Sequence, residues 1–420
     1  MCRYNFRAAA DGMANEFHFS YTKITFILAM WSVAYGFGQL VNGLICDRIG
    51  GRASMTIGAV GTIIVNLIYG FASFAGTFST FALIWLFNGY LQSFGAPGFI
   101  KINAAWFNRS ERGTFSGIFG FMIQLGQLAI NNLALIILAG FTIGTWAVAP
   151  NQWRWLFRLP PIITAIMAIL VALVPRETPE AAGYPGCVKD DSDTSAGDTA
   201  SVQVGIKECF VTIFKHPLVW YYALAYAATG AVRHSSDQLS VLYFTKYLHL
   251  DLTKNPASVT WTLNIVPMVA VIGSIISGVV SDKIFQGRRS PVAMGLYFLL
   301  SAVLALAAIV MWTGLAGPTR TGIFLGCFFL ILVSFSVNAT HSVVGAAAPM
   351  DIGGRRMAGF ASGVIDSFQY FSSAIALPAT GALLDSKYGW LAWYPVMVFF
   401  GLLGAAAMLV VMHKQRRMSP

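Results

Sequence analysis

The chain has 420 residues, of which 56% are hydrophobic and only 10% are charged. Its mean hydropathy is +0.67, whereas soluble proteins carry roughly a quarter charged residues. A water-soluble enzyme or binding domain is therefore excluded, and most of the surface must face lipid. The net charge of +10 does not indicate nucleic acid as a partner, because the cations gather in particular loops, as they do in membrane proteins.

Long apolar segments recur along the chain and predict spanning helices, since a helix needs roughly 20 apolar residues to cross a bilayer. Only helices or closed barrels satisfy the backbone in lipid, and these segments are continuously apolar rather than alternating. Five lie in the first part of the chain, at residues 23–46, 53–74, 79–104, 114–140 and 155–174. Six lie in the second part, at residues 217–238, 258–280, 290–313, 321–347, 356–384 and 388–412.

Between the two sets of spans lies a polar stretch, residues 175–215, rich in Pro, Gly, Ser, Thr and acidic side chains. We therefore predict an N-terminal helical half at 1–174, a cytoplasmic linker at 175–215, a C-terminal six-helix half at 216–413 and a cytoplasmic tail at 414–420. The stretch from Met1 to about Ala14 is too short to span a membrane. If the halves are repeats, it is the inner end of a first helix whose beginning is missing, and we expect such a truncated helix.

One short motif closes an apolar segment in each half. It consists of a glycine, an aspartate four positions later and a cation, and the two glycines and two aspartates share an offset of 235 positions. Such duplication is typical of transporter architecture. We expect the motif to be a conformational latch, with a purely structural turn as the alternative. Its members are Gly43, Asp47, Arg48 and Arg52 in the first copy, and Asp282, Lys283 and Arg288 after Gly278 in the second.

The distribution of cations predicts the orientation, because cytoplasmic loops are enriched in Lys and Arg. Sixteen cations lie in one set of loops and the tail, and seven lie on the opposite side, so we expect both termini to face the cytoplasm. The sixteen are Arg48, Arg52, Arg109, Arg112, Arg176, Lys189, Lys207, Lys215, Lys283, Arg288, Arg289, Arg355, Arg356, Lys414, Arg416 and Arg417. The seven are Lys23, Arg154, Arg158, Lys246, Lys254, Arg320 and Lys387.

Two arginines lie at similar places in the two halves, Arg3 and Arg233. An arginine at mid-membrane costs roughly 2.5–3.5 kcal/mol even on lenient insertion scales, and two that face each other also repel. An anion between them would relieve both costs, because guanidinium groups match phosphate or carboxylate oxygens in a bidentate way. The alternative is that a local acid, such as Asp11 or Asp237, neutralises each arginine.

Further polar residues on neighbouring segments are candidates for the same wet cavity. We expect substrate contacts from Tyr35, Gln39, Lys101, Gln124, Tyr243 and His341. Each has a structural alternative, since polar amides bond neighbouring helices and a lysine near a helix end reaches for the interface. His341 is also a candidate for proton coupling, as is Asp366, which interrupts an apolar stretch that carries no cation.

The sequence carries no Walker motif, GxSxG or HExxH. The five cysteines are scattered without metal or disulfide spacing. We therefore expect no enzymatic activity, no cofactor and no metal site. Without a nucleotide site, transport would be driven by a gradient or by exchange.

Several motifs together resemble a known family. The duplicated Gly-Asp-cation loops look like the signature loops of the major facilitator superfamily. Closer matches resemble the organophosphate:phosphate antiporters, which include bacterial glycerol-3-phosphate and hexose-6-phosphate transporters. They are Arg3-Tyr4-Asn5-Phe6, Ala34-Tyr35-Gly36-Phe37, the run from Gln92 to Pro97 followed by Lys101, Trp106-Phe107, Glu111-Arg112-Gly113 and Arg176-Glu177-Thr178-Pro179, with Arg233 where that family has a seventh-helix arginine.

The resemblance implies a twelve-helix fold of two pseudo-symmetric halves that exchanges a phosphorylated sugar or polyol for inorganic phosphate, as a monomer in the inner cell membrane. At three places, however, this chain differs from the pattern of that family. Gly38-Gln39 stands where that family usually has a lysine, Ile123-Gln124 where the glycerol-3-phosphate transporters have a histidine, and Ala96 where a tryptophan precedes the proline. Two alternatives therefore stay open, a proton-coupled carboxylate symporter and a transport-dead sugar-phosphate sensor.

Overall fold

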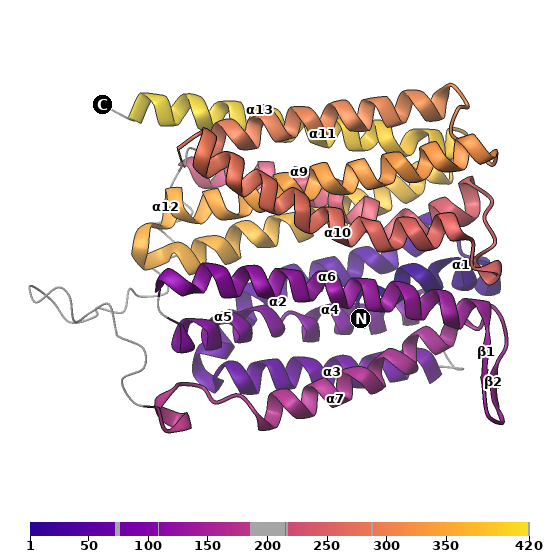
Figure 1. Cartoon of the computed structure of the whole chain (residues 1–420), viewed down its shortest axis with the longest axis horizontal. Helices are drawn as coiled ribbons and strands as arrows, with labels where there is room; N and C mark the ends of the chain where they lie inside the picture. Colours follow the sequence, from indigo (N-terminus) through magenta and orange to yellow (C-terminus); the bar gives the residue numbers. More distant parts are fainter. Residues whose placement is uncertain (72–75, 108, 185–214, 216, 287–288, 419–420) are drawn as a thin grey trace, which may run out of the picture.

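The computed structural model describes residues 1–71, 76–107, 109–184, 215, 217–286 and 289–418. Within these ranges, only the backbone is described for residues 47, 104, 109–117, 119, 217, 282, 346–362 and 418. Long helices lie side by side along the longest axis of the molecule (Figure 1). In the described part, eight helical segments are long and apolar enough to cross a membrane.

The first group of helices comes from the N-terminal part of the chain and forms the lower layer in Figure 1. It also carries a small antiparallel hairpin, in which Phe141 pairs with Val148. The helices are α1 (Asn5–Phe17), α2 (Tyr21–Ile49), α3 (Gly51–Phe71), α4 (Phe78–Gln92), α5 (Gly95–Trp106), α6 (Arg109–Ala139) and α7 (Leu159–Leu173), and the hairpin strands are β1 (Phe141–Ile143) and β2 (Trp146–Val148).

The second group forms the upper layer (Figure 1). Its long helices are α9 (Pro217–Leu242), α10 (Ala257–Val279), α11 (Arg289–Trp312), α12 (Arg320–Leu384) and α13 (Trp393–Met418). Single π-type turns extend two of them, η4 (Tyr243–Tyr247) after α9 and η6 (Val280–Ile284) after α10. Four short 3₁₀ turns complete the list of elements, η1 (Trp153–Phe157), η2 (Glu180–Ala182), η5 (Leu252–Lys254) and η7 (Gly389–Ala392).

The predicted continuous span at 79–104 is wrong in one respect, because it is broken into α4 and α5. The helix stops at Gln92, and Ser93 at its end donates its hydroxyl to the Tyr90 carbonyl at 2.6 Å. A second helix then starts at Gly95, which places Pro97 in its first turn. Proline is tolerated there because the N–H that it lacks would have no partner inside the helix.

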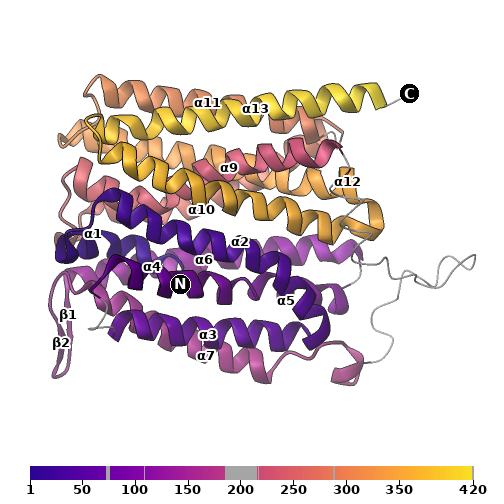
Figure 2. The ribbon, with the colours of Figure 1, turned by 180° about the vertical axis from the view of Figure 1, so that it is seen from behind.

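The range of α12 covers two antiparallel limbs, which correspond to the two predicted spans at 321–347 and 356–384. Both of its ends lie at the same end of the molecule. A Cβ on Gly326 would meet the Tyr243 hydroxyl at 2.6 Å, and the Tyr243 ring lies 5.8 Å from Trp390, just beyond the other end of α12. The chain therefore reverses within the range, as Figures 1 and 2 show.

The two ends of the molecule are named by what they carry. The hairpin end holds β1 and β2, and the linker end holds the C-terminus and the segment that follows α7 (Figures 1 and 2). Between the groups, α2 packs against α12 and α6 packs against α10. Polar contacts join both pairs, since the hydroxyls of Ser32 and Ser373 lie 3.2 Å apart and Asn132 donates to Asn264 at 2.7 Å.

The start of α1 is fixed by contacts within the first group. The Asn5 amide donates to Asn66 Oδ1 at 2.8 Å and to the Leu156 carbonyl at 3.0 Å. The Phe6 ring is fully buried and lies 4.9 Å from the Trp85 ring. Because these anchors flank the start of the helix, they position Arg3 at the boundary between the two groups.

Candidate functional site

Arg3 lies in a cage of four aromatic rings. Its guanidinium carbon is 4.3 Å from the ring centroid of Trp31, 5.5 Å from those of Tyr4 and Tyr35, and 5.6 Å from that of Tyr370. Cations are attracted to the faces of such rings. The Nε atom of Arg3 is buried and has no hydrogen-bond partner in the described part of the chain. The cage therefore stabilises the charge and leaves N–H donors for another acceptor.

Arg233 on α9 contacts a histidine of the neighbouring helix. Its Nη1 lies 3.1 Å from Nε2 of His341 on α12. The His341 ring stacks on Tyr226, with centroids 5.0 Å apart and an angle of 10° between the planes. A guanidinium only donates, so Nε2 must accept, which gives a neutral imidazole with its proton on Nδ1. The Arg233 Nε and His341 Nδ1 atoms are buried, and neither has a partner among the described residues.

Asp366 on α12 adds a carboxyl group near both arginines. It accepts a hydrogen bond from the side-chain amide of Gln369, one turn farther along the helix. The Gln39 amide on α2 lies beside the Asp366 carboxyl and the Tyr35 phenol. This acid is therefore held by two amides, one from each group of helices.

The two acids that the sequence offered as alternative partners form no direct ion pair with Arg3 or Arg233 in the described part of the chain, although the Asp237 carboxylate acts on Arg233 electrostatically. The Asp11 carboxylate forms an ion pair with Lys246 at 2.8 Å. Asp237 contributes its backbone carbonyl to Arg7, whose Nη1 is 3.1 Å away. Among the described residues, no ion pair within 4 Å joins a carboxylate to Arg3 or Arg233. Among the described residues, therefore, neither of these half-buried arginines has a carboxylate in direct contact.

The predicted polar residues divide into two sets. Tyr35 and Gln39 lie with Arg3, and His341 lies with Arg233, as described above. Lys101 donates to the Cys46 carbonyl at 3.0 Å and lies toward the linker end of the first group. Tyr243 is fully buried among Trp390, Trp393 and Tyr247 at the hairpin end.

Lys101 and Tyr243 therefore do not join the arginine cluster in this conformation. Lys101 instead contacts the end of α2, where the Cys46 carbonyl also accepts from the Gly50 N–H at 2.9 Å. Gln124 is half-buried on α6, and no hydrogen bond between it and either arginine is described.

The duplicated motif lies at the linker end in both groups. The side chains of Asp47 and Asp282, and all of Arg288, lie outside the described residues. Gly43 has open space where a Cβ would stand, and Arg48 and Lys283 are exposed.

Arg52 of this motif is engaged within its own group, because its Nη1 donates to the Pro175 carbonyl at 3.4 Å. Beside it, the Glu177 carboxylate accepts from the backbone N–H groups of Gly51 at 2.8 Å and of Arg52 at 2.9 Å. It therefore caps the N-terminus of α3, where a negative charge is favourable. A Cβ on Gly50, whose φ is +94°, would meet Glu177 Oε1 at 2.6 Å.

Sequence reasoning missed several residues of this region. Trp31 and Tyr370 form part of the cage, although aromatic residues at helical spacing usually indicate only a packed core. Arg7 was not among the residues expected at the site. Its signal was its place four residues after Arg3, which puts both on one face of a helix.

The described contacts between the groups run from the hairpin end to mid-depth. The Asp385 carboxylate, just after α12, accepts from the backbone N–H groups of Tyr21 at 2.9 Å and of Thr22 at 2.7 Å. Partial burial alone would raise the pKa of Asp385, but the hydrogen bonds from Thr22 and Tyr21 outweigh it and lower the pKa from its ordinary value. At mid-depth, the Ser367 hydroxyl donates to the Gly36 carbonyl at 3.2 Å.

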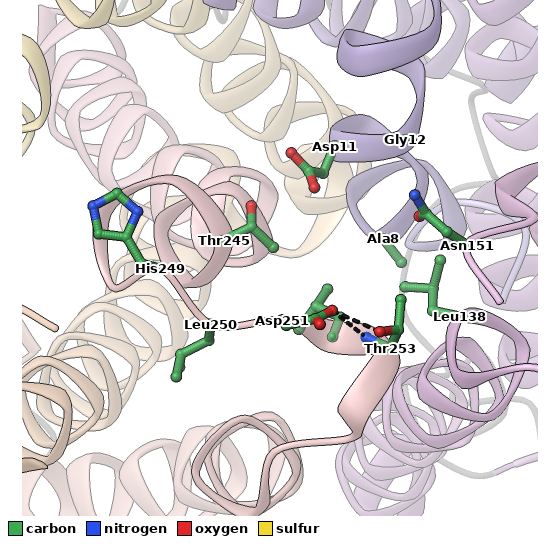
Figure 3. Close-up of a pocket in the computed structure, with 11 residues that line it drawn as sticks. Ala8, Asp11, Gly12, Leu138, Asn151, Thr245, His249, Leu250, Asp251 and Thr253 are labelled. Atoms are coloured by element: carbon green, nitrogen blue, oxygen red, sulfur yellow. Dashed lines mark hydrogen bonds between the residues drawn. The ribbon is translucent and has the colours of Figure 1, made fainter.

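A separate cavity of about 280 Å³ opens at the hairpin end, between α1 and the segment that follows η4 (Figure 3). Asp11 and Asp251 line it, and Asp251 accepts from the Thr253 hydroxyl at 2.7 Å. Hydrogen bonds from the Thr253 side chain and backbone lower the pKa of Asp251. Carboxylates repel an anion, so this cavity does not share the chemistry of the arginine cluster.

Comparison with known proteins gives a consistent match over most of the chain. The family model described as Major Facilitator Superfamily matches residues 1–377. A glycerol-3-phosphate transporter from Haemophilus influenzae is 27% identical over 98% of this chain and 87% of its own length. One from Bacillus subtilis is 28% identical over 93% of this chain and 84% of its own. The membrane sensor protein UhpC from Escherichia coli is 25% identical over 98% and 89%.

Solved structures show the same fold. A bacterial homologue of the human lysosomal transporter Spinster, in an inward-facing and unoccupied conformation, gives a TM-score of 0.71 at 14% identity, covering 97% of this chain and 94% of its own. The xylose transporter XylE from Escherichia coli, partially occluded and inward open, gives 0.70 at 13% identity, covering 100% and 96%. At such identities the likeness concerns the fold alone.

Proposed function

The chain belongs to the Major Facilitator Superfamily, and from that premise we propose that it exchanges a phosphorylated sugar or polyol for inorganic phosphate across the inner cell membrane. It is an integral, multi-pass membrane transporter and not an enzyme. The observation that carries the proposal is the pair Arg3 and Arg233. Their buried Nε atoms have no hydrogen-bond partner in the described part of the chain, and no carboxylate there forms an ion pair with either.

An anion would stabilise this arrangement. Each arginine at membrane depth costs roughly 2.5–3.5 kcal/mol, and hydrogen bonds between ionised partners are about twice as strong as neutral ones. A phosphate group carries enough oxygen atoms to bind two guanidiniums at once. Relatives named as glycerol-3-phosphate, hexose phosphate and phosphoglycerate transporters support a phosphate ester as the substrate.

The roles of the surrounding residues follow from their positions. Arg3 and Arg233 would hold the phosphoryl group, and Tyr35, Gln39 and His341 would contact the remainder of the substrate. Lys101, Gln124 and Tyr243 would act only in another conformation, since none of them is described in contact with the arginines here. Position 39 is a glutamine where the antiporter family usually has a lysine, so the site carries less positive charge.

Exchange requires the two groups to rock around the bound anion, which is the usual basis of alternating access. The contacts of Asp385 and Lys246 would hold the hairpin end closed. The motif residues Gly43, Asp47, Arg48, Arg52, Asp282, Lys283 and Arg288 would latch the linker end in the opposite state. The larger share of loop cations favours a cytoplasmic linker end, with both termini on that side, and a single chain would suffice as the working unit.

A second candidate function is proton-coupled symport of an organic anion such as a carboxylate. It is favoured by the carboxyl of Asp366, held by Gln369 and Gln39, and by His341, whose neutral ring accepts from Arg233. Protonation of either group would change the charge beside the arginines. A transport-dead sensor is a third reading, supported by the relatives named as membrane sensor proteins.

The test is counterflow of radiolabelled phosphate in proteoliposomes, with unlabelled glycerol 3-phosphate, hexose phosphates and carboxylates as competitors. Exchange predicts phosphate entry that one phosphate ester inhibits, and no effect of an uncoupler. Arg233→Ala should abolish this uptake, because the phosphoryl group loses half of its clamp. Normal uptake by that variant at normal expression would refute the proposed clamp. Carboxylate uptake that an uncoupler stops would favour symport, and binding without transport would favour a sensor.

A further inference from the structure

Arg7 is a third buried arginine beside the site, one helical turn from Arg3 toward the hairpin end. Its side chain is only 2% exposed, and its guanidinium carbon lies 5.4 Å from the Tyr4 ring, which also contacts Arg3. In the described part of the chain, no carboxylate lies within ion-pair distance of Arg7. A charge at this depth is thus held by neutral acceptors, which is an expensive arrangement.

One of the two neutral acceptors belongs to the other group of helices, and the second is itself bonded to that group. Nη1 of Arg7 donates to the Asp237 carbonyl of α9 at 3.1 Å, and Nη2 donates to Asn131 Oδ1 of α6. The Asn131 amide in turn donates to the Leu263 carbonyl of α10 at 2.6 Å. Arg7 and Asn131 therefore join the first group to the second at two points.

The acid that shares a helix with Arg7 is held away from it. Asp11 follows Arg7 by four residues on α1 and so lies on the same helix face. Its carboxylate is paired with Lys246 at 2.8 Å, and Lys246 also donates to Asn15 at 2.9 Å. Among the described residues Arg7 therefore has no carboxylate in direct contact, and the Asp237 carboxylate of α9 acts on it only electrostatically.

We propose that Arg7 is a further anion-binding residue, used when the hairpin end is open. This inference rests on the proposed function. Separation of the groups at the hairpin end breaks the bond from Arg7 to the Asp237 carbonyl and leaves Nη1 without an acceptor in a water-filled opening. An entering anion replaces the neutral carbonyl with a stronger, charge-assisted bond. Arg7 then lies between the opening and Arg3, so the anion passes from one guanidinium to the next.

The experiment compares the KM for phosphate and for glycerol 3-phosphate on the two faces of the membrane. Right-side-out vesicles report the hairpin end, and inverted vesicles report the linker end. Arg7→Gln should raise the KM from the hairpin side at least tenfold, because bonds to charged groups contribute about 1.5–3 kcal/mol and about 1.4 kcal/mol is tenfold. The KM from the linker side should change less than threefold, since Arg7 is buried behind the site there.

Asn264→Ala is the matched control. It removes the reciprocal amide contact between α6 and α10 at the level of Leu263, so it weakens the same closure without removing a cation. It should leave the KM on the hairpin side within about threefold of the wild type. Arg7→Lys keeps the charge and loses the planar fork, so an intermediate KM is expected. That variant also tests the inference if Arg7→Gln fails to insert.

The outcomes separate the two proposals. Wild-type vesicles that transport neither probe would refute the proposed function, and this inference would fall with it. A transporting wild type, with Arg7→Gln and Asn264→Ala changing the KM alike on both faces, would refute only the inference. Arg7 would then be a structural tie between the groups. The inference would be established by a KM that rises in Arg7→Gln only from the hairpin side and is partly restored in Arg7→Lys.

Discussion

Arg3 and Arg233 are stabilised by different surroundings, although they stand at corresponding places in the two halves. Arg3 is covered by rings of Trp31, Tyr35 and Tyr370, which balance its charge, and its buried Nε has no partner among the described residues. Arg233 instead gives one donor to His341. Each solution keeps the guanidinium charged and leaves at least one N–H for an anion, which is the property a binding site requires.

Trp31 offers a direct test of the aromatic cage. Trp31→Leu should raise the KM for phosphate by about 2- to 30-fold, since cation–π contacts contribute about 0.5–2 kcal/mol and about 1.4 kcal/mol is tenfold. The measurement is phosphate counterflow at several concentrations. Trp31→Phe is the control, because it keeps a π face and the buried Nε1 that it removes has no partner among the described residues. Equal effects of both variants would argue against the cage.

At the scale of elements, close packing of α9 against α12 builds the second half of the site. A Cβ on Gly230 would lie 2.4 Å from the Gln369 carbonyl oxygen and 2.5 Å from its Cα. Only glycine allows the two backbones to approach this closely. One turn from this contact in sequence lie Arg233 on α9 and Asp366 on α12, so the approach fixes the distance between the clamp and its nearby acid.

Gly230→Ala should therefore push α9 and α12 apart and reduce phosphate uptake by more than tenfold. Overpacking of this kind costs about 1–3 kcal/mol, so a lower thermal midpoint of the detergent-solubilised protein is also expected. Gly295→Ala on α11 is the matched control, because a Cβ there meets nothing within 4 Å. Wild-type uptake by Gly230→Ala would show that the helices can separate without disturbing the site.

At the scale of the whole molecule, the two ends differ in charge and in their contacts. The sequence places sixteen cations on one side and seven on the other, and the described members of the larger set, such as Arg48, Lys283 and Lys414, lie at the linker end. The described contacts that join the groups lie instead between the hairpin end and mid-depth. This arrangement suits a transporter whose site opens toward one side at a time.

The orientation can be tested by labelling with a membrane-impermeant maleimide. Trp146→Cys in the hairpin should react in intact cells, because the indole is exposed and the hairpin end is expected to face outward. Lys414→Cys at the linker end should react only after the cells are opened. The five natural cysteines are replaced first. Labelling of Lys414→Cys in intact cells would reverse the predicted topology.

The sequence by itself determined the fold class and the superfamily. Continuous apolar segments cannot be satisfied in water, and the repeated Gly-Asp-cation motif reveals the duplication. Arg3 and Arg233 were also proposed as anion-binding residues from the sequence, because a charge within an apolar segment is costly and therefore conspicuous, and that role stays a prediction. The break between α4 and α5 was missed, although Pro97 signalled it, because hydropathy alone does not register a change of helix direction.

Only the tertiary structure decided what surrounds each charge. Lys101 and Tyr243 were expected to contact the substrate together with Arg3, but the packing of helices places them outside the arginine cluster. From the sequence alone, Asp11 was an equally good candidate to neutralise an arginine, but in the folded chain it forms an ion pair with Lys246. Such pairings join residues more than 200 positions apart, so no local pattern encodes them. They follow from which helix faces meet when the two halves close together.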